Sequence, residues 1–206
     1  MPRFVTVLML ACLASSVVPE AEACLRKMPK ARLAKQQVDP TRRDVLAAEK
    51  ALGKGDAAKA AKLARRAVPG LDQLPPVGAA ELATRAQRTL ALAVIRSGGA
   101  TPVSDDMPGK TAEEQRLNVA WAQLVLHYHA AMNADNVVIQ VQLAEALAST
   151  EPERPQALGI LRDLSTRDLM PTASGYALLA QLESDATLRD AALSRCRELG
   201  GTTCKA

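Results

Sequence analysis

The segment from Val45 to Pro69 constrains the fold more than any other part of the chain, because it has the pattern of two short helices joined by a tight turn. Gly55 and Asp56 mark the predicted turn, and Asp56 has a side chain suited to capping the second helix. In that helix, alanines recur every three or four residues, at positions 57, 60, 64 and 67. Such a stripe of small side chains lets two helix axes approach closely. The segment therefore predicts a helical hairpin, and it favours a scaffold over a catalytic core.

Three more helix pairs are predicted between this hairpin and the C-terminus. Thr41, with Asp44 three residues later, is the expected N-cap of the first helix of the chain. Glycine and proline positions mark the remaining helix ends, and leucine and alanine recur between them at helical spacing. The expected pairs are 79–97 with a helix that begins at Thr111, 136–149 with 155–168, and 172–184 with 186–199.

The helix that begins at Thr111 carries the strongest amphipathic pattern. Thr111 and Glu114 predict a capping box at its start. Large apolar side chains then recur at three- and four-residue intervals, at Leu117, Trp121, Leu124, Tyr128 and Met132. This spacing predicts one face buried in the core. On the same helix, His127 is expected at the edge of that face and His129 nearly in solvent.

The first hairpin combines a small residue in its first helix, Gly-Asp at its turn and alanines along its second helix, at Ala48, Gly55, Asp56, Ala60 and Ala67. In these residues it resembles a tetratricopeptide repeat, although alanines 51, 57 and 64 replace the aromatic residues usual at other positions. Ala144 and Ala180 are 36 residues apart, near the repeat length of about 34. Over residues 41–200, the resemblance implies an all-α fold, a short right-handed solenoid of about four antiparallel helix pairs.

The N-terminus has the features of a secretory signal peptide, predicted to span residues 1–23. Arg3 precedes an apolar run from Phe4 to Val18, and Ala21-Glu22-Ala23 forms a small-x-small cleavage site. The apolar run is shorter than the about 20 residues of a membrane span. We therefore expect an exported protein, periplasmic or secreted, whose mature part begins with a basic, irregular leader at residues 24–40.

Cys24 would be the first residue after cleavage, where a bacterial lipoprotein carries its lipid. Ala21 and Glu22 differ from the residues usual in a lipoprotein signal. Lipidation of Cys24, with anchoring in the outer membrane, is therefore the minor alternative. The expected C-terminal tail is residues 201–206.

Cys196 and Cys204 are the predicted disulfide pair. An exported chain meets an oxidising compartment, and Gly200-Gly201 lets the backbone turn back between the two cysteines. The alternative pairs Cys24 with Cys204, which would tie the two ends of the mature chain together.

Several functional classes are not expected. The sequence contains no G-x-S-x-G, no H-E-x-x-H and no paired C-x-x-C motif. We therefore expect no enzymatic activity, no cofactor and no metal site. The net charge of +4 is mildly basic, but aromatic residues make up only 2% of the chain. Together with export, this argues against nucleic-acid binding, which uses aromatic stacking.

Arg85, Arg88 and Arg96 fall within about 80° of one another on a helix. If the chain stacks as a tetratricopeptide array does, the first helices line a concave groove, and the three arginines face into it. Further groove residues would be Arg42, Glu49, Gln142, Glu145 and Gln181. Arginine forks suit carboxylates. A solvated helix face is the alternative explanation for these arginines.

The sequence thus predicts an exported helical-repeat scaffold or adaptor that binds a protein or peptide partner in a groove. The alternative is a structural envelope component, held at a membrane or wall surface by a lipid on Cys24 or by the basic leader.

Overall fold

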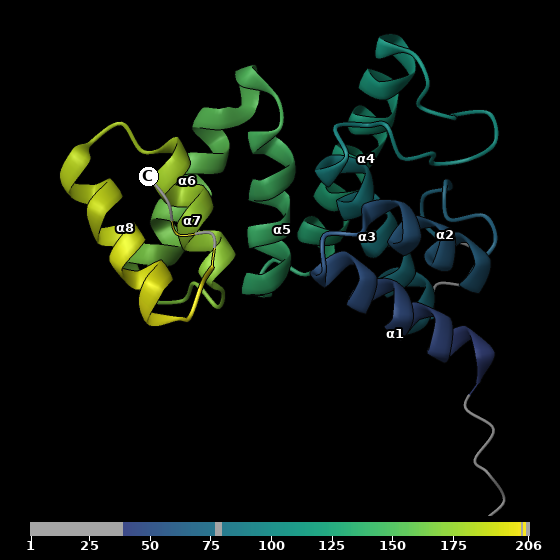
Figure 1. Ribbon diagram of the computed structural model, residues 1–206, viewed down its shortest axis with the longest axis horizontal. Helices are drawn as coiled ribbons and strands as arrows, with labels where there is room; N and C mark the ends of the chain where they lie inside the picture. The colour runs from purple at the N-terminus through teal and green to yellow at the C-terminus, as the bar shows by residue number, and fades with distance from the viewer. Residues whose placement is uncertain (1–38, 77–79, 203, 205–206) are drawn as a thin grey trace, which may run out of the picture. The chain divides into compact units, whose positions relative to one another are not determined.

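The computed structural model describes residues 39–76, 80–202 and 204, and this part of the chain is all-α (Figure 1). The predicted signal peptide, Cys24 and the leader up to residue 38 lie outside the described residues. The described part contains eight α-helices and no β-strand. The helices are α1 (Pro40–Gly53), α2 (Ala57–Ala67), α3 (Glu81–Arg96), α4 (Ala112–Met132), α5 (Val137–Ala148), α6 (Arg154–Thr166), α7 (Ala173–Leu182) and α8 (Ala186–Glu198). The all-α prediction is confirmed, and the predicted helix ends agree to within about two residues.

The helices pack in a regular order. Each helix packs against the next one along the chain, and the odd-numbered helices also pack against one another, α1 against α3, α3 against α5 and α5 against α7. Among the described helices, the even-numbered ones do not touch each other. The odd-numbered helices therefore form a continuous row, and each even-numbered helix lies beside its neighbours in that row.

The first hairpin packs through small side chains, as its sequence predicts. Ala60 and Ala64 of α2 are fully buried, as is Ala48 of α1. The Asp56 carboxylate caps α2 by accepting the backbone N–H of Lys59 at 3.1 Å. The close contact of α1 and α2 thus follows from alanines at their interface.

The predicted cap of the first helix is wrong. Asp39, and not Thr41, is the N-cap, and its carboxylate accepts the backbone N–H of Thr41 at 3.0 Å. Pro40 occupies the first turn, where its missing N–H costs nothing. Asp44 does not take part in a capping box; its two oxygens accept hydrogen bonds from Arg66 of α2 at 2.7 and 2.8 Å.

The predicted buried face of α4 is also wrong. Its capping box is present, with Thr111 and Glu114 in the expected roles. However, Leu117, Leu124 and Met132 are exposed by 56%, 59% and 67%. The buried side chains belong to a different face of α4, formed by Asn118, Ala122, Val125, Leu126, His129 and Ala130.

Polar partners on other elements explain why this face of α4 is the buried one. The side-chain amide of Asn118 donates to the backbone carbonyls of Gly99 and Thr101, at 2.9 and 3.3 Å. His129, expected nearly in solvent, is only 2% exposed and is hydrogen-bonded to Gln87 of α3. A buried polar side chain is stable when it has such partners. The small residues between them let α4 lie close to α3 and α5.

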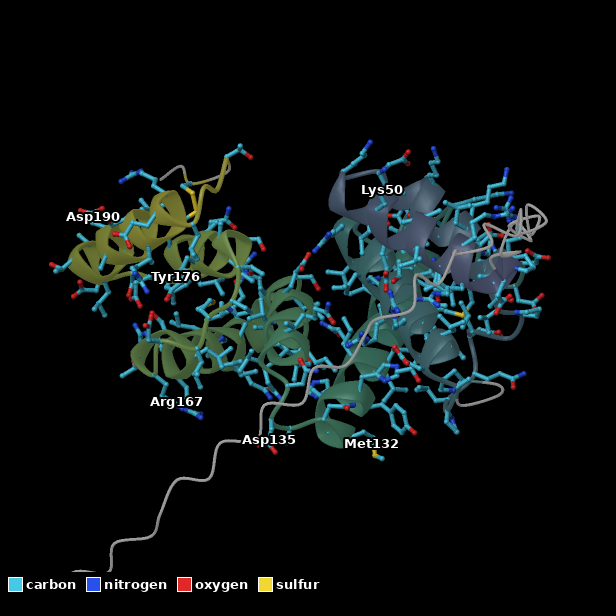
Figure 2. The ribbon with its side chains drawn as sticks, turned by 90° about the horizontal axis from the view of Figure 1, so that it is seen from below. Lys50, Met132, Asp135, Arg167, Tyr176 and Asp190 are labelled. Atoms are coloured by element: carbon cyan, nitrogen blue, oxygen red, sulfur yellow. A yellow bond between two sulfur atoms is a disulfide. The ribbon has the colours of Figure 1, made fainter. Side chains whose placement is uncertain are left out.

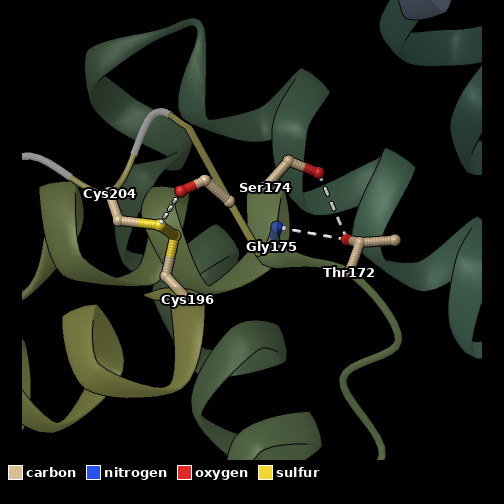
Figure 3. The surroundings of a disulfide bond; sticks show 6 residues. Thr172, Ser174, Gly175, Cys196 and Cys204 are labelled. Atoms are coloured by element: carbon tan, nitrogen blue, oxygen red, sulfur yellow. Dashed lines mark hydrogen bonds between the residues drawn. A yellow bond between two sulfur atoms is a disulfide. The ribbon is translucent and has the colours of Figure 1, made fainter. Parts of the chain in front are cut away.

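The C-terminal end of α8 is covalently closed. Cys196 and Cys204 form a disulfide, with an S–S distance of 2.02 Å (Figure 3). Gly201 lies between this disulfide and the first turn of α7, where a Cβ atom on residue 201 would come within 2.8 Å of the Ala173 side chain. The alternative pairing of Cys204 with Cys24 is therefore not the one adopted.

Candidate partner-binding groove

The groove residues predicted from the sequence all belong to the row of odd-numbered helices. They are Arg42 and Glu49 on α1, Arg85, Arg88 and Arg96 on α3, Gln142 and Glu145 on α5, and Gln181 on α7. The structure brings four of these residues together in pairs, as described below. Arg42 and Gln181 are exposed, and neither makes a side-chain hydrogen bond to another described residue.

Two of the three arginines are already paired within the chain. Arg85 donates from Nε and Nη2 to the two carboxylate oxygens of Glu49, at 2.9 and 2.6 Å. Arg96 makes the same kind of fork with Glu145, at 2.6 and 3.0 Å. In each pair the carboxylate holds the pKa of the arginine above its usual value. These forks join α1 to α3 and α3 to α5, so both arginines hold neighbouring helices of the row together.

Arg88 has a different environment. It has no ion-pair partner among the described residues, and its Nε atom is buried without a hydrogen-bond partner there. Burial lowers the pKa of the Arg88 guanidinium, and Glu49 only partly opposes this effect. The side-chain oxygen of Gln142 on α5 is likewise buried and unpartnered within the described residues. These two groups retain unused hydrogen-bonding capacity in the row.

A hollow of about 560 Å³ lies along the row. Its lining comes from the end of α1 and the following turn, from α3, from α5 and from α7: Leu52, Gly53, Gly55, Arg96, Val141, Glu145, Ser174, Ala177, Leu178 and Gln181. The Arg96–Glu145 ion pair supplies a charged wall, and leucine, valine and alanine side chains supply apolar surface. Such a mixture suits a ligand with both apolar and polar groups.

Sequence reasoning found Arg96, Glu145 and Gln181 in this lining but missed the α7 residues beside them. Ser174, Ala177, Leu178 and Gln181 occupy positions i, i+3, i+4 and i+7 of α7. That spacing marks one face of a helix. It was a readable signal for a shared surface, although it did not indicate which surface α7 would share.

No cluster of three or more histidine, cysteine, aspartate or glutamate side chains is placed within the described residues to hold a metal ion. None of the described helices combines the length and the apolar character that crossing a membrane requires.

Comparisons with known proteins give no further guide to this groove. The chain matches no protein-family description, no curated protein and no solved structure.

Proposed function

We propose that this protein is an exported helical-repeat adaptor that binds an extended peptide or protein segment in the groove beside α7, without catalysing a reaction. The observation that carries the proposal is the hollow of about 560 Å³ lined by four odd-numbered helices. Its wall is held in place by the Arg96–Glu145 fork. A preformed groove loses little conformational entropy when a ligand enters it.

The packing order supports a tetratricopeptide-like solenoid. Consecutive helices pack together, and each odd-numbered helix also packs on the next odd-numbered one. Stacked two-helix repeats produce this pattern, because each repeat contacts mainly its neighbours. The proposed arrangement has four pairs, α1 with α2, α3 with α4, α5 with α6 and α7 with α8. Its odd-numbered helices line the groove.

The lining suggests how a peptide is held. Leu52 and Leu178 offer apolar surface for one ligand side chain, and Gln181 offers an amide for a hydrogen bond to the ligand backbone. Arg88 lies eight residues before Arg96 on α3, a distance of about 12 Å along the helix. An extended peptide covers that distance in about four residues. We therefore infer a ligand whose apolar side chain enters the hollow beside Arg96 and whose carboxylate, about four residues away, pairs with Arg88, which lies outside the lining of the hollow.

The test is selection of random peptides from a displayed library by the protein produced from the full sequence. We expect enriched peptides to carry an apolar residue and an acidic residue about four positions apart. Gln181→Trp should abolish their binding, because the indole fills part of the hollow. Gln156→Trp is the matched control, since Gln156 is exposed on α6 and lies outside the hollow. Arg88→Gln should remove the acidic preference while leaving the apolar one.

Two results would contradict this function. One is the absence of any enriched peptide class, and the other is equal peptide binding by the Gln181→Trp and Gln156→Trp variants. Replacing Arg85 or Arg96 is a poorer test, because either change breaks an ion pair between helices and perturbs the scaffold.

The second proposed function is a structural envelope component. The observation in its favour is the small-x-small sequence directly before Cys24, followed by a basic stretch. It predicts that the protein fractionates with the envelope and is released by Cys24→Ser or by high salt. Recovery of the unchanged protein entirely in the soluble fraction would exclude this alternative.

A further inference from the structure

Helix α4 carries an apolar face that no other described helix covers. Leu117, Leu124 and Met132 are exposed by 56%, 59% and 67%, and Trp121 and Tyr128 are partly exposed beside them. Among the described helices, α4 packs only against α3 and α5, on its opposite side. In Figure 2 the labelled Met132 points away from the neighbouring helices. A contiguous exposed apolar surface of this kind marks an interaction site.

The spacing of this face indicates that its partner is a helix. Leu117, Trp121, Leu124 and Tyr128 are separated by four, three and four residues. Alternation of three and four is the spacing of the apolar seam in paired helices. Trp121 packs partly against the core and donates from Nε1 to the backbone carbonyl of Asp72 at 2.9 Å. The exposed remainder of the seam can be covered by a second seam of the same spacing on another helix.

The charge distribution indicates that the partner of this seam is the α4 seam of a second copy of the chain. From Leu117 to Ala134 the chain contains no aspartate, glutamate, lysine or arginine. Two copies of this face can therefore meet without like-charge repulsion. The charged residues nearest its two ends are opposite in sign, Arg116 before the seam and Asp135 after it, and both are exposed. In an antiparallel pair centred on Leu124, Asp135 of each copy lies opposite Glu113 of the other and within one helical turn of its Arg116, so Arg116 lies between the two carboxylates.

We propose that α4 of a second copy of this chain covers this face, in an antiparallel pair with twofold symmetry centred on Leu124. In that arrangement Leu124 meets its own counterpart, and Leu117 meets Ala131. Twofold pairing of identical patches is the usual symmetry of protein dimers. The α4 face is separate from the groove beside α7, and a dimer would present two such grooves.

The size of the face determines the expected strength of the dimer. The seam spans about 22 Å of helix. Eight residues per copy belong to the face, at positions 117, 120, 121, 124, 127, 128, 131 and 132, whereas a standard interface uses about 20–30 residues per side. We therefore expect a reversible dimer with a dissociation constant in the micromolar range.

Sedimentation analysis over a concentration series tests the proposal with the protein produced from the full sequence. We expect a change from monomer to dimer across the micromolar range. Leu124→Glu should abolish this change, because it places two carboxylates against each other at the symmetry axis. Leu188→Glu is the matched control: Leu188 is 52% exposed on α8, outside the proposed interface, and this variant should dimerise as the unchanged protein does.

Disulfide trapping tests the antiparallel direction independently of any effect of Leu124→Glu on folding. In a Cys24→Ser background, Leu124→Cys should form a cross-linked dimer on mild oxidation, because position 124 meets itself. Leu117→Cys should not, because its two copies lie about 21 Å apart along the helices. Ala131→Cys mixed with Leu117→Cys should form the crossed pair.

Three results would overturn the proposal. They are a monomer at every concentration, a dimer that Leu124→Glu leaves unchanged, and efficient cross-linking of Leu117→Cys to itself. If the protein stays monomeric and binds a hydrophobic dye that Leu124→Glu prevents from binding, the α4 face has an occupant other than a second copy, and the dimer proposal is overturned.

Discussion

Nε2 of His129 lies 2.9 Å from the side-chain oxygen of Gln87, inside the contact between α4 and α3. The amide nitrogen of Gln87 donates to the backbone carbonyls of Leu71 and Gln73, at 2.9 and 2.6 Å. Because both amide protons are used, the Gln87 oxygen accepts a hydrogen bond, and His129 donates it from Nε2. His129 therefore carries a proton on Nε2, and its pKa of about 4 keeps the ring neutral at pH 7.

The neutrality of His129 predicts a loss of stability in mild acid. Burial, with a smaller contribution from the charge of Arg88, lowers the pKa of His129 from 6.5 to about 4. Between these values the unfolded chain takes up a proton that the folded chain does not, so stability falls as the pH decreases from 6.5 towards 4. The expected loss in the free energy of unfolding is at most about 3 kcal/mol. Urea unfolding at a series of pH values measures it.

Two variants separate His129 from other acid-sensitive groups. His129→Gln keeps a side chain that can bond Gln87 but removes the titrating ring, so its stability should change less than that of the unchanged protein between pH 6.5 and 5. His127→Gln should retain the full loss, because His129 is still present. Equal pH dependence of the unchanged protein and His129→Gln would contradict the assigned role of this residue.

The ion pair between Arg85 and Glu49 predicts measurable coupling between α1 and α3. The two side chains are 26% and 33% exposed and share two hydrogen bonds, so solvent screens them only in part. A double-mutant cycle with Arg85→Met and Glu49→Gln should give a coupling energy of about 0.5–1 kcal/mol. The Asp163–Arg167 pair, which is 61% exposed on both sides, is the comparison and should give no measurable coupling. Equal coupling in the two pairs would contradict a structural role for the Arg85 fork.

Local signals predicted the helices of this fold but not which way α4 faces. Caps and turns depend on a few adjacent residues, so Asp56 and the Thr111–Glu114 box were readable from the sequence. On α4, however, two different faces both have helical spacing. The polar face is buried because Gln87 and the carbonyls of the loop after α3 supply hydrogen-bond partners. Those partners are distant in sequence, so spacing alone favoured the larger apolar residues.

The same limit applies to the groove. In the sequence Arg85 and Arg96 look unpaired, because their ion-pair partners, Glu49 and Glu145, are 36 and 49 residues away. The sequence predicted that all four residues lie on the odd-numbered helices, but it did not indicate which of them form ion pairs. Arg88 remained unpaired because Glu49 is already engaged by Arg85. Pairing across helices depends on their relative height and rotation, which no local pattern specifies.

Replacing Gly99 by alanine, which adds a single methyl group, is expected to destabilise the protein strongly. Its φ is +85°, in the left-handed region, and a Cβ atom there would overlap the backbone of Gln115 on α4. Gly99→Ala should therefore lower the free energy of unfolding by about 2 kcal/mol or more, through overpacking and backbone strain together. Gly98→Ala is the control, because Gly98 also has a positive φ, +61°, but faces open space. Chemical denaturation should show a clearly smaller loss for Gly98→Ala, and equal losses would contradict the steric explanation.

The disulfide between Cys196 and Cys204 predicts a limited effect of reduction on stability. It closes a loop across a sequence separation of 8 residues, and cross-linking so short a loop removes little entropy from the unfolded chain, worth about 2–3 kcal/mol at most. Most core residues lie elsewhere, along α1 to α7, so we expect the reduced protein to remain folded. Denaturation of the unchanged protein and of Cys204→Ser, each with and without reductant, measures the effect. Reductant should destabilise only the unchanged protein; complete unfolding on reduction would instead show that the end of α8 supports the whole domain.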